Sequence, residues 1–162
     1  MAIISVMVKD SGTPMIQKIA ELEEKSRIKL SVTKKILLAE TGTVEQILSI
    51  LSGKETTVKV LKQIEDREFI SRDAYIITKQ DGTTLLRARS YLFVSNLPKK
   101  FVDKVRRKKG GIGNIIVDSE LETFRKIIKI GYDSNSDTIF KVYYVLHRGK
   151  VAIEIRESFS SR

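Results

Sequence analysis

The chain has 162 residues, 41% of them hydrophobic, which suits a single domain over residues 1–162. It has no cysteine and one histidine, which excludes disulfides, thiolate chemistry and His/Cys metal clusters. It has no apolar run of about 18 residues, and Met1–Lys9 lacks the basic region and cleavage site of a signal peptide, so no membrane contact and a cytoplasmic location are expected. The net charge of +10 either attracts an anionic partner, nucleic acid or a small carboxylate, or reflects a solvated surface with excess lysine.

The first third of the chain predicts helices. Apolar residues recur at helical spacing over residues 14–29, and a shorter apolar run over residues 33–39 indicates a further turn or two of helix. After a break at Gly42, Thr43 and Gln46 have the spacing of a capping box at the start of a third helix. Gly53 is the expected end of that helix.

A predicted strand over residues 56–67 is followed by a predicted hairpin. Two β-prone runs, residues 72–79 and 83–93, flank an Asp81-Gly82 pair, which favours a tight type I′ turn. On the first run Arg72 shares a face with apolar residues, and on the second run a face is shared by Leu86, Ala88, Ser90 and Leu92.

Pro98 predicts the start of another helix, which runs into the basic residues Arg106–Lys109. The Gly110-Gly111-Ile112-Gly113 sequence that follows does not have P-loop or dinucleotide-loop spacing. It is expected to end the preceding helix and not to open a new one. The lysine and arginine side chains complement the carbonyl groups at the end of that helix. The role of the basic run is left open.

Three more strands are expected over residues 123–132, 138–147 and 151–159, the last two joined by a short turn at Arg148-Gly149-Lys150. Helices come first and strands with short turns follow. This order favours an α+β fold with about six strands in a mostly antiparallel sheet and helices packed over it.

Two charged residues are in phase with buried apolar residues. Arg72 is one, and Glu157 continues the inward series of Ile153 and Ile155. If their strands are antiparallel, both side chains lie at the same end of the sheet, bracketing an apolar recess for a small carboxylate ligand. Two alternatives remain open: the strand frays before Glu157, or the two charges form a structural ion pair.

An ordered set of features resembles the chorismate lyase family, in particular its small archaeal and bacterial branch. The features cover about two thirds of the chain: Thr41-Gly42-Thr43 before the Ile47/Leu48 helix, Arg72 ahead of an Asp-Gly turn, Ala88-Arg89-Ser90, Ile112-Gly113 before Ile115-Ile116, Arg125 ahead of Ile127-Ile128, and Glu157-Ser158-Phe159.

The resemblance implies an internal ligand pocket under flap-like segments, and the conversion of chorismate to 4-hydroxybenzoate and pyruvate without metal or organic cofactor. It implies that Arg72 holds the ring carboxylate and that Glu157 contacts the hydroxyl end of the ring. Around the ring the implied substrate-binding residues are Gly42 at the start of a flap, Ala88 as a small residue, Ile112 as an apolar wall, and Gly113 in the adjoining loop.

The chain departs from the family pattern at Gly111, where proline is usual, and over Met1–Asp10, whose role is left open. A non-catalytic binder or sensor of a small aromatic acid is the alternative on the same fold. Nucleic-acid binding is supported by net charge alone, so the expected partner is a small chorismate-like anion. The oligomeric state does not follow from the sequence.

Overall fold

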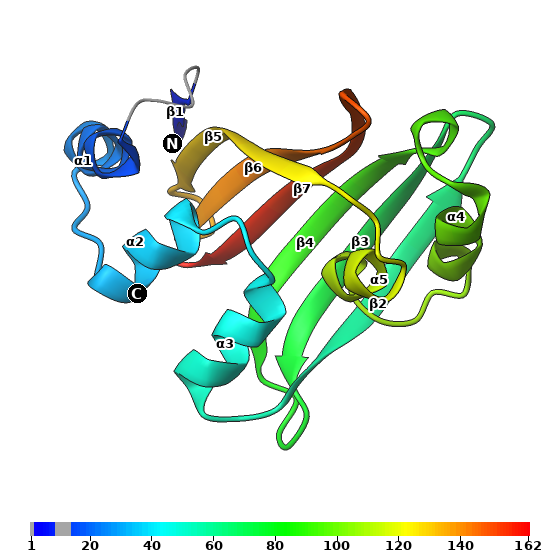
Figure 1. The fold of residues 1–162 in the computed structure, drawn as a ribbon. Helices are drawn as coiled ribbons and strands as arrows, with labels where there is room; N and C mark the ends of the chain where they lie inside the picture. The colour runs from blue at the N-terminus through cyan, green and yellow to red at the C-terminus, as the bar shows by residue number, and fades with distance from the viewer. Residues whose placement is uncertain (1, 9–13) are drawn as a thin grey trace.

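A computed structural model describes residues 2–8 and 14–162 (Figure 1). Met1, Lys9 and Asp10 of the N-terminal segment lie outside the described residues. The helices are α1 (Met15–Ser26), α2 (Val32–Ala39), α3 (Val44–Ser52), the 3-10 helix η1 (Val94–Asn96), α4 (Lys99–Arg106) and α5 (Ile112–Asp118). The strands are β1 (Ile3–Met7), β2 (Thr56–Glu65), β3 (Phe69–Thr78), β4 (Thr84–Phe93), β5 (Phe124–Asp133), β6 (Thr138–His147) and β7 (Lys150–Ser160).

The described strands form one antiparallel sheet in the order β1-β5-β6-β7-β4-β3-β2. The sheet has one strand more than the sequence indicates, because the apolar start of the chain pairs with β5 as β1. Gly131 permits this pairing: a Cβ atom there would lie 2.7 Å from the Ile4 carbonyl oxygen and would overlap the Phe140 ring.

The helices pack against one face of this sheet (Figure 1). Each of the α-helices among the described residues contributes buried apolar side chains to a core shared with β3, β4, β6 and β7. On β3 the burial alternates strictly from Phe69 to Thr78, as expected for a strand with one face on the core. The predicted α+β class with a mostly antiparallel sheet and helices over it is confirmed.

The turn between β3 and β4 is longer than the predicted two-residue type I′ turn. The Thr78 amide donates to the Thr83 carbonyl, which encloses the four residues 79–82, and the Gly82 amide donates to the Thr78 carbonyl within this loop. Gly82 has a φ of +68°, but Asp81 does not have the positive φ that a type I′ turn requires. Instead, the Asp81 carboxylate accepts hydrogen bonds from the Thr78 hydroxyl and the Thr83 amide, which stabilises the wider loop.

Two local predictions at helix starts are wrong. Thr43 precedes α3, but its side chain does not cap the helix; its carbonyl oxygen accepts from the Gln46 amide. The glycine-rich segment after α4 does open a helix, since Gly111 is the N-cap of α5 and Ile112 is its first residue. The helix α4 ends earlier, at Arg106. The predicted end of α3 at Gly53, with a φ of +66°, is confirmed.

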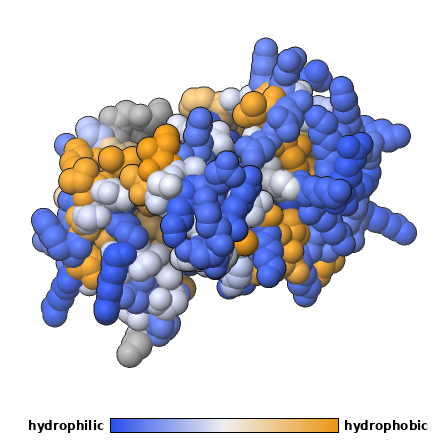
Figure 2. All heavy atoms as spheres, turned by 90° about the horizontal axis from the view of Figure 1, so that it is seen from below, coloured by the Kyte–Doolittle hydropathy of each residue, from blue (hydrophilic) through white to orange (hydrophobic). Residues whose placement is uncertain are grey.

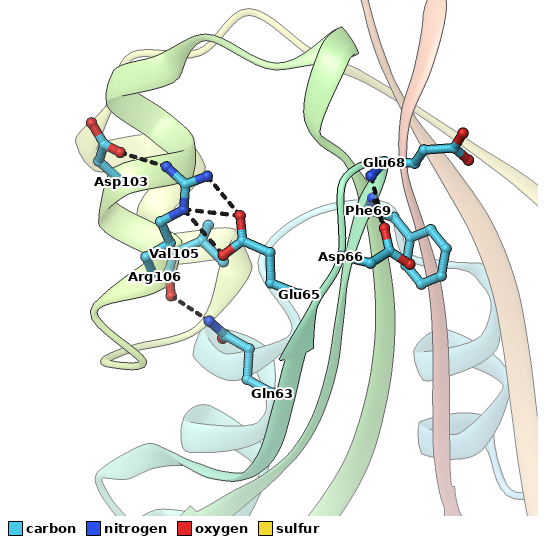
Figure 3. Close-up of polar contacts among 8 residues, drawn as sticks. All are labelled: Gln63, Glu65, Asp66, Glu68, Phe69, Asp103, Val105 and Arg106. Atoms are coloured by element: carbon cyan, nitrogen blue, oxygen red, sulfur yellow. Dashed lines mark hydrogen bonds and ion pairs between the residues drawn. The ribbon is translucent and has the colours of Figure 1, made fainter.

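Polar and charged contacts hold α4 against the C-terminal end of β2, as Figure 3 shows. Arg106 pairs with Glu65 at 2.6 Å and with Asp103 at 2.9 Å, and the Gln63 side chain donates to the Val105 carbonyl. The hydrogen bonds that Arg106 donates to the carboxylates of Glu65 and Asp103 raise the pKa of Arg106. At least one residue of the basic run therefore has a structural role: it fixes the helix that leads into the Gly110–Gly113 segment.

The face in Figure 2 is covered mostly by hydrophilic side chains, and its hydrophobic atoms form separate patches. Among residues 2–8 and 14–162, no helix has the length and apolar character needed to cross a membrane.

Candidate functional site

The sheet face that carries Arg72 lines a pocket together with the start of α3 and the start of α5. Its volume is about 60 Å³. The wall is largely apolar, with charged side chains at the edges. The lining residues are Thr43, Val44, Glu45, Val58, Arg72, Ala74, Ile76, Ala88, Ser90, Gly111, Ile112, Gly113, Arg125, Tyr143, Ile155 and Glu157.

Arg72 is a buried arginine that has no ionic partner among residues 2–8 and 14–162. Only 3% of its surface is exposed, and Nη2 donates a hydrogen bond of 2.5 Å to the Gly110 carbonyl. Nε and Nη1 are buried and have no hydrogen-bond partner in the described part of the chain, and no carboxylate there lies within 4.0 Å. Burial lowers the pKa of Arg72, which reflects the cost of keeping an uncompensated charge out of water. The structural Arg72–Glu157 ion pair is thereby excluded.

Glu157 is equally buried, at 3% exposed, and β7 continues past it to Ser160, so the strand does not fray there. The Tyr143 hydroxyl donates a 2.7 Å hydrogen bond to Oε1. The ammonium of Lys141 lies 3.4 Å from Oε2, which has no hydrogen-bond partner among the described residues. Burial, followed by the charge of Glu157, raises the pKa of Tyr143 well above its ordinary value, so the phenol remains a donor.

Lys141 links Glu157 to the segment between α2 and α3. The Lys141 side chain is 1% exposed and donates to the Glu40 carbonyl at 2.8 Å and to its carboxylate at 2.5 Å. Glu40 is the C-cap of α2 and is followed by Thr41–Thr43, which leads into the pocket wall. One buried ammonium therefore bridges two carboxylates, one in the pocket and one at the start of the covering segment.

Cross-strand pairing places Arg72 and Glu157 near each other. Arg72 pairs with Ser90 on β4, while Glu157 pairs with Ala88 on β4 and Lys141 on β6. The two charged residues thus lie one row apart with one strand between them, about 10 Å across and about 7 Å along the strands. The sequence argument assumed that the strands of Arg72 and Glu157 are antiparallel to each other, which is wrong. The strands β3 and β7 both run antiparallel to β4, so β3 and β7 are parallel to each other.

The pocket also brings together three of the other predicted residues. Ala88 lies on β4, the strand between those of Arg72 and Glu157, directly opposite Glu157, and Ile112 and Gly113 belong to the first turn of α5. Gly42 does not line the pocket. Its carbonyl oxygen accepts a hydrogen bond from Arg125, and its neighbour Thr43 is part of the wall. The binding and catalytic roles assigned to these residues stay predictions.

Four charged or polar residues of the site were not singled out from the sequence as site residues: Lys141, Tyr143, Arg125 and Glu45. Lys141 was detectable, because it shares its phase on β6 with the inward residues Ile139, Tyr143 and Val145. Glu45 could not be detected, because it lies on the first turn of a helix. The Glu45 carboxylate accepts from the Asn114 side chain at 2.8 Å, and its pKa is raised, first of all by burial.

The arrangement suits a flat anion with a hydrogen-bonding group at its other end. Arg72 offers a carboxylate the N–H groups of two nitrogens that have no partner among the described residues, and Ala74 and Ala88 leave space on the sheet. Glu157 offers Oε2, which lies 3.4 Å from the Lys141 ammonium and accepts no hydrogen bond from the described residues. A volume of about 60 Å³ holds only a few water molecules. A ring-sized ligand therefore requires a wider pocket than this one.

A family model described as "Chorismate pyruvate-lyase Rv2949c-like" matches residues 31–162. Proteins named chorismate pyruvate-lyase from Mycobacterium tuberculosis (strain ATCC 25618 / H37Rv) and Mycobacterium bovis (strain ATCC BAA-935 / AF2122/97) are each 26% identical over 161 residues, an alignment that covers 81% of this chain and 81% of the relative. The crystal structure of PhnF from Mycobacterium smegmatis is similar in fold, with a TM-score of 0.52 and 9% identity, covering 96% of this chain and 89% of that chain. Because the family model spans most of its length, this chain belongs to the Rv2949c-like chorismate pyruvate-lyase family.

Proposed function

We propose that this protein eliminates pyruvate from chorismate to give 4-hydroxybenzoate, with Arg72 anchoring the ring carboxylate and Glu157 at the hydroxyl end of the ring. Membership of the family supports the reaction. The single observation that carries the residue assignment is that two buried nitrogens of Arg72 have no hydrogen-bond partner among the described residues, in a pocket that also contains the Glu157 carboxylate. We propose a cytoplasmic location, in keeping with a sequence that lacks cysteine.

The reaction is strongly favourable, because the ring becomes aromatic, so the protein needs to supply few chemical groups. The proton at C4 leaves, its electron pair enters the ring, and the ether bond at C3 breaks. The side chain departs as the enolate of pyruvate, which takes up a proton. Glu157 is the group at this end of the pocket able to accept the C4 proton or to orient the C4 hydroxyl, since Tyr143 and Lys141 hold its carboxylate in place.

Arg72 contributes orientation. A guanidinium that binds a carboxylate through two parallel hydrogen bonds fixes both the position and the plane of the ring. Each such parallel pair includes Nη2, which carries two N–H groups. One of them is bound to the Gly110 carbonyl, and the other lies beside Nε or Nη1, neither of which has a partner among the described residues. The apolar side chains of Ala74, Ala88 and Ile112 then exclude water around the ring and hold the side chain in an eliminating conformer.

The test is to incubate the purified protein with chorismate and to follow pyruvate release and 4-hydroxybenzoate affinity in two variants, Arg72→Ala and Glu157→Gln. Both variants are expected to lose turnover, and Arg72→Ala is also expected to lose affinity. Arg89→Ala on β4 and Glu154→Gln on β7 are matched controls, because they remove the same charges from outward-facing positions. If turnover and affinity survive both site variants, the assignment is wrong. Tight binding of the aromatic acid without pyruvate release would instead identify a non-catalytic binder.

A further inference from the structure

Arg125 on β5 is a second guanidinium that lines the pocket. Its Nη1 donates to the Gly42 carbonyl, its Cζ lies 5.9 Å from the centre of the Tyr143 ring, and its Nη2 lies 3.7 Å from where a Cβ atom of Gly113 would be. Within the described part of the chain, no carboxylate lies within 4.0 Å of this guanidinium, and Nε and Nη2 make no hydrogen bond. Arg125 is therefore held in orientation by a backbone carbonyl while most of its donors remain available.

The carboxylates of the pocket have charged or hydrogen-bonding side-chain partners, whereas its guanidinium groups have no anionic partner among the described residues. Its two carboxylates are engaged, since Glu157 accepts from Tyr143 and lies against Lys141, and Glu45 accepts from the Asn114 amide. Within the part of the chain that the structure describes, its two guanidinium groups are bonded only to neutral carbonyl oxygens. Partly buried guanidinium groups without anions gain most from a ligand that supplies them, so this pocket suits a ligand with two negative charges.

The two arginines approach the pocket from opposite sides of the sheet face. Arg72 is on β3 and Arg125 on β5, with β4, β7 and β6 between them, so their backbones are about 19 Å apart. Both long side chains reach the same pocket from these positions. Arg125 reaches the part of the pocket that contains Tyr143, the donor to Glu157, whereas Arg72 is bound at the Gly110 end.

We propose that Arg125 binds a second carboxylate of the ligand, so that the site selects cyclic dicarboxylates over monocarboxylates. The inference rests on the proposed function. In chorismate the second carboxylate is on the enolpyruvyl ether at C3, next to the C4 hydroxyl. With the ring carboxylate on Arg72 and the hydroxyl at Glu157, that ether flanks the Glu157 end of the ring, the end that Arg125 reaches.

This assignment has a consequence for turnover. When the ether bond breaks, the second carboxylate leaves with pyruvate, and the remaining aromatic acid has one carboxylate only. Arg125 then holds the substrate and the departing fragment but not the ring product. It is a specificity-determining residue that strengthens substrate binding without strengthening retention of 4-hydroxybenzoate.

The experiment compares two ligands that need no turnover, 4-hydroxybenzoate and 3-carboxymethoxy-4-hydroxybenzoate, which adds an ether-linked carboxylate at C3. Their affinities are measured by calorimetry with the unmodified protein, Arg125→Gln and Arg125→Lys. The unmodified protein is expected to bind the dicarboxylate at least about tenfold tighter than 4-hydroxybenzoate. This ratio of the two affinities should fall to about one in Arg125→Gln and should be intermediate in Arg125→Lys. Lys126→Gln, an exposed neighbour on β5, makes the same change in net charge and should leave the ratio unchanged.

An affinity ratio that is the same in the unmodified protein and Arg125→Gln overturns the proposal, and so does a failure of either ligand to bind. Equal losses for both ligands would show that Arg125 only supports the Gly42 segment, which also overturns it. The proposed function is tested separately with chorismate. If the affinity ratio depends on Arg125 but no pyruvate is released, the lyase function is rejected and the Arg125 subsite is supported. If pyruvate is released and Arg125→Gln leaves KM unchanged, the lyase function is supported and the subsite is rejected.

Discussion

Glu157 on β7 is paired directly with Lys141 on β6, and the Lys141 ammonium lies 3.4 Å from the carboxylate oxygen Oε2 of Glu157. The same ammonium binds Glu40 at the end of α2. A residue on the floor of the pocket and a residue of the segment that covers it are thus joined through one buried charge. This relationship makes the stability of the site and the position of its cover depend on a single side chain.

Replacing Lys141 by methionine is expected to lower the free energy of unfolding by about 3–5 kcal/mol, because two buried carboxylates lose their cation. Urea unfolding measures the change. In a Glu40→Gln background the loss should be smaller by about 0.5–3 kcal/mol, since one of the carboxylates is then already neutral. Lys126→Met, at an exposed position on the neighbouring strand, is the control and should change stability little. Additive effects of the two substitutions would contradict the bridging role.

Arg72→Met separates a binding arginine from a structural one. Methionine has a similar length and no charge, so the cost of burying an unpartnered guanidinium disappears, and the free energy of unfolding should be unchanged or higher. Affinity for 4-hydroxybenzoate should fall by about 2–5 kcal/mol, because the ligand carboxylate loses its cation. Calorimetric titration and urea unfolding measure the two quantities. A destabilised variant with normal affinity would mean that Arg72 serves the fold.

The pH dependence of Tyr143 provides a third prediction. Burial and the adjacent Glu157 raise its pKa above the ordinary value near 10. For an acid whose pKa is higher in the folded state, the associated stability is fully present below pH 10 and is lost as the pH rises through the folded-state pKa. Tyr143 should therefore ionise only as the protein unfolds.

The measurement is the difference in tyrosinate absorbance between the unmodified protein and Tyr143→Phe, followed with rising pH alongside circular dichroism. The two proteins should differ by one tyrosinate only once the secondary structure is lost. A difference that develops near pH 10 in the folded protein would show that the phenol is accessible and does not donate firmly to Glu157.

Filling the pocket should block it without unfolding the protein. Ala88 lies on the sheet between Arg72 and Glu157, so Ala88→Leu adds three carbon atoms to a volume of about 60 Å³. Affinity for 4-hydroxybenzoate should fall at least about tenfold, while overpacking costs about 1–3 kcal/mol of stability at most. Ala88→Val, with a smaller side chain, should have an intermediate affinity. Unchanged affinity in both variants would place the ligand elsewhere.

Local sequence patterns predicted most of the elements and much of the site. The strict alternation on β3 and β7 singled out Arg72 and Glu157, because an unusual residue in a regular series is visible from its neighbours alone. The same test applied to β6 would have found Lys141. The strand β1 was missed because five residues carry a weak pattern, and its pairing depends on Gly131, far away in the sequence.

What the sequence by itself determined is periodicity: which side chains share a face of a strand or helix, and hence which charges are turned inward. What only the tertiary structure decided is which of these inward charges meet. Strand order and register arise from pairing between distant segments, and these placed β4 between Arg72 and Glu157, made their strands parallel, and brought Arg72, Arg125 and Tyr143 to one pocket. Local preferences contain no information about such distances, because the free energy of pairing belongs to both partners together.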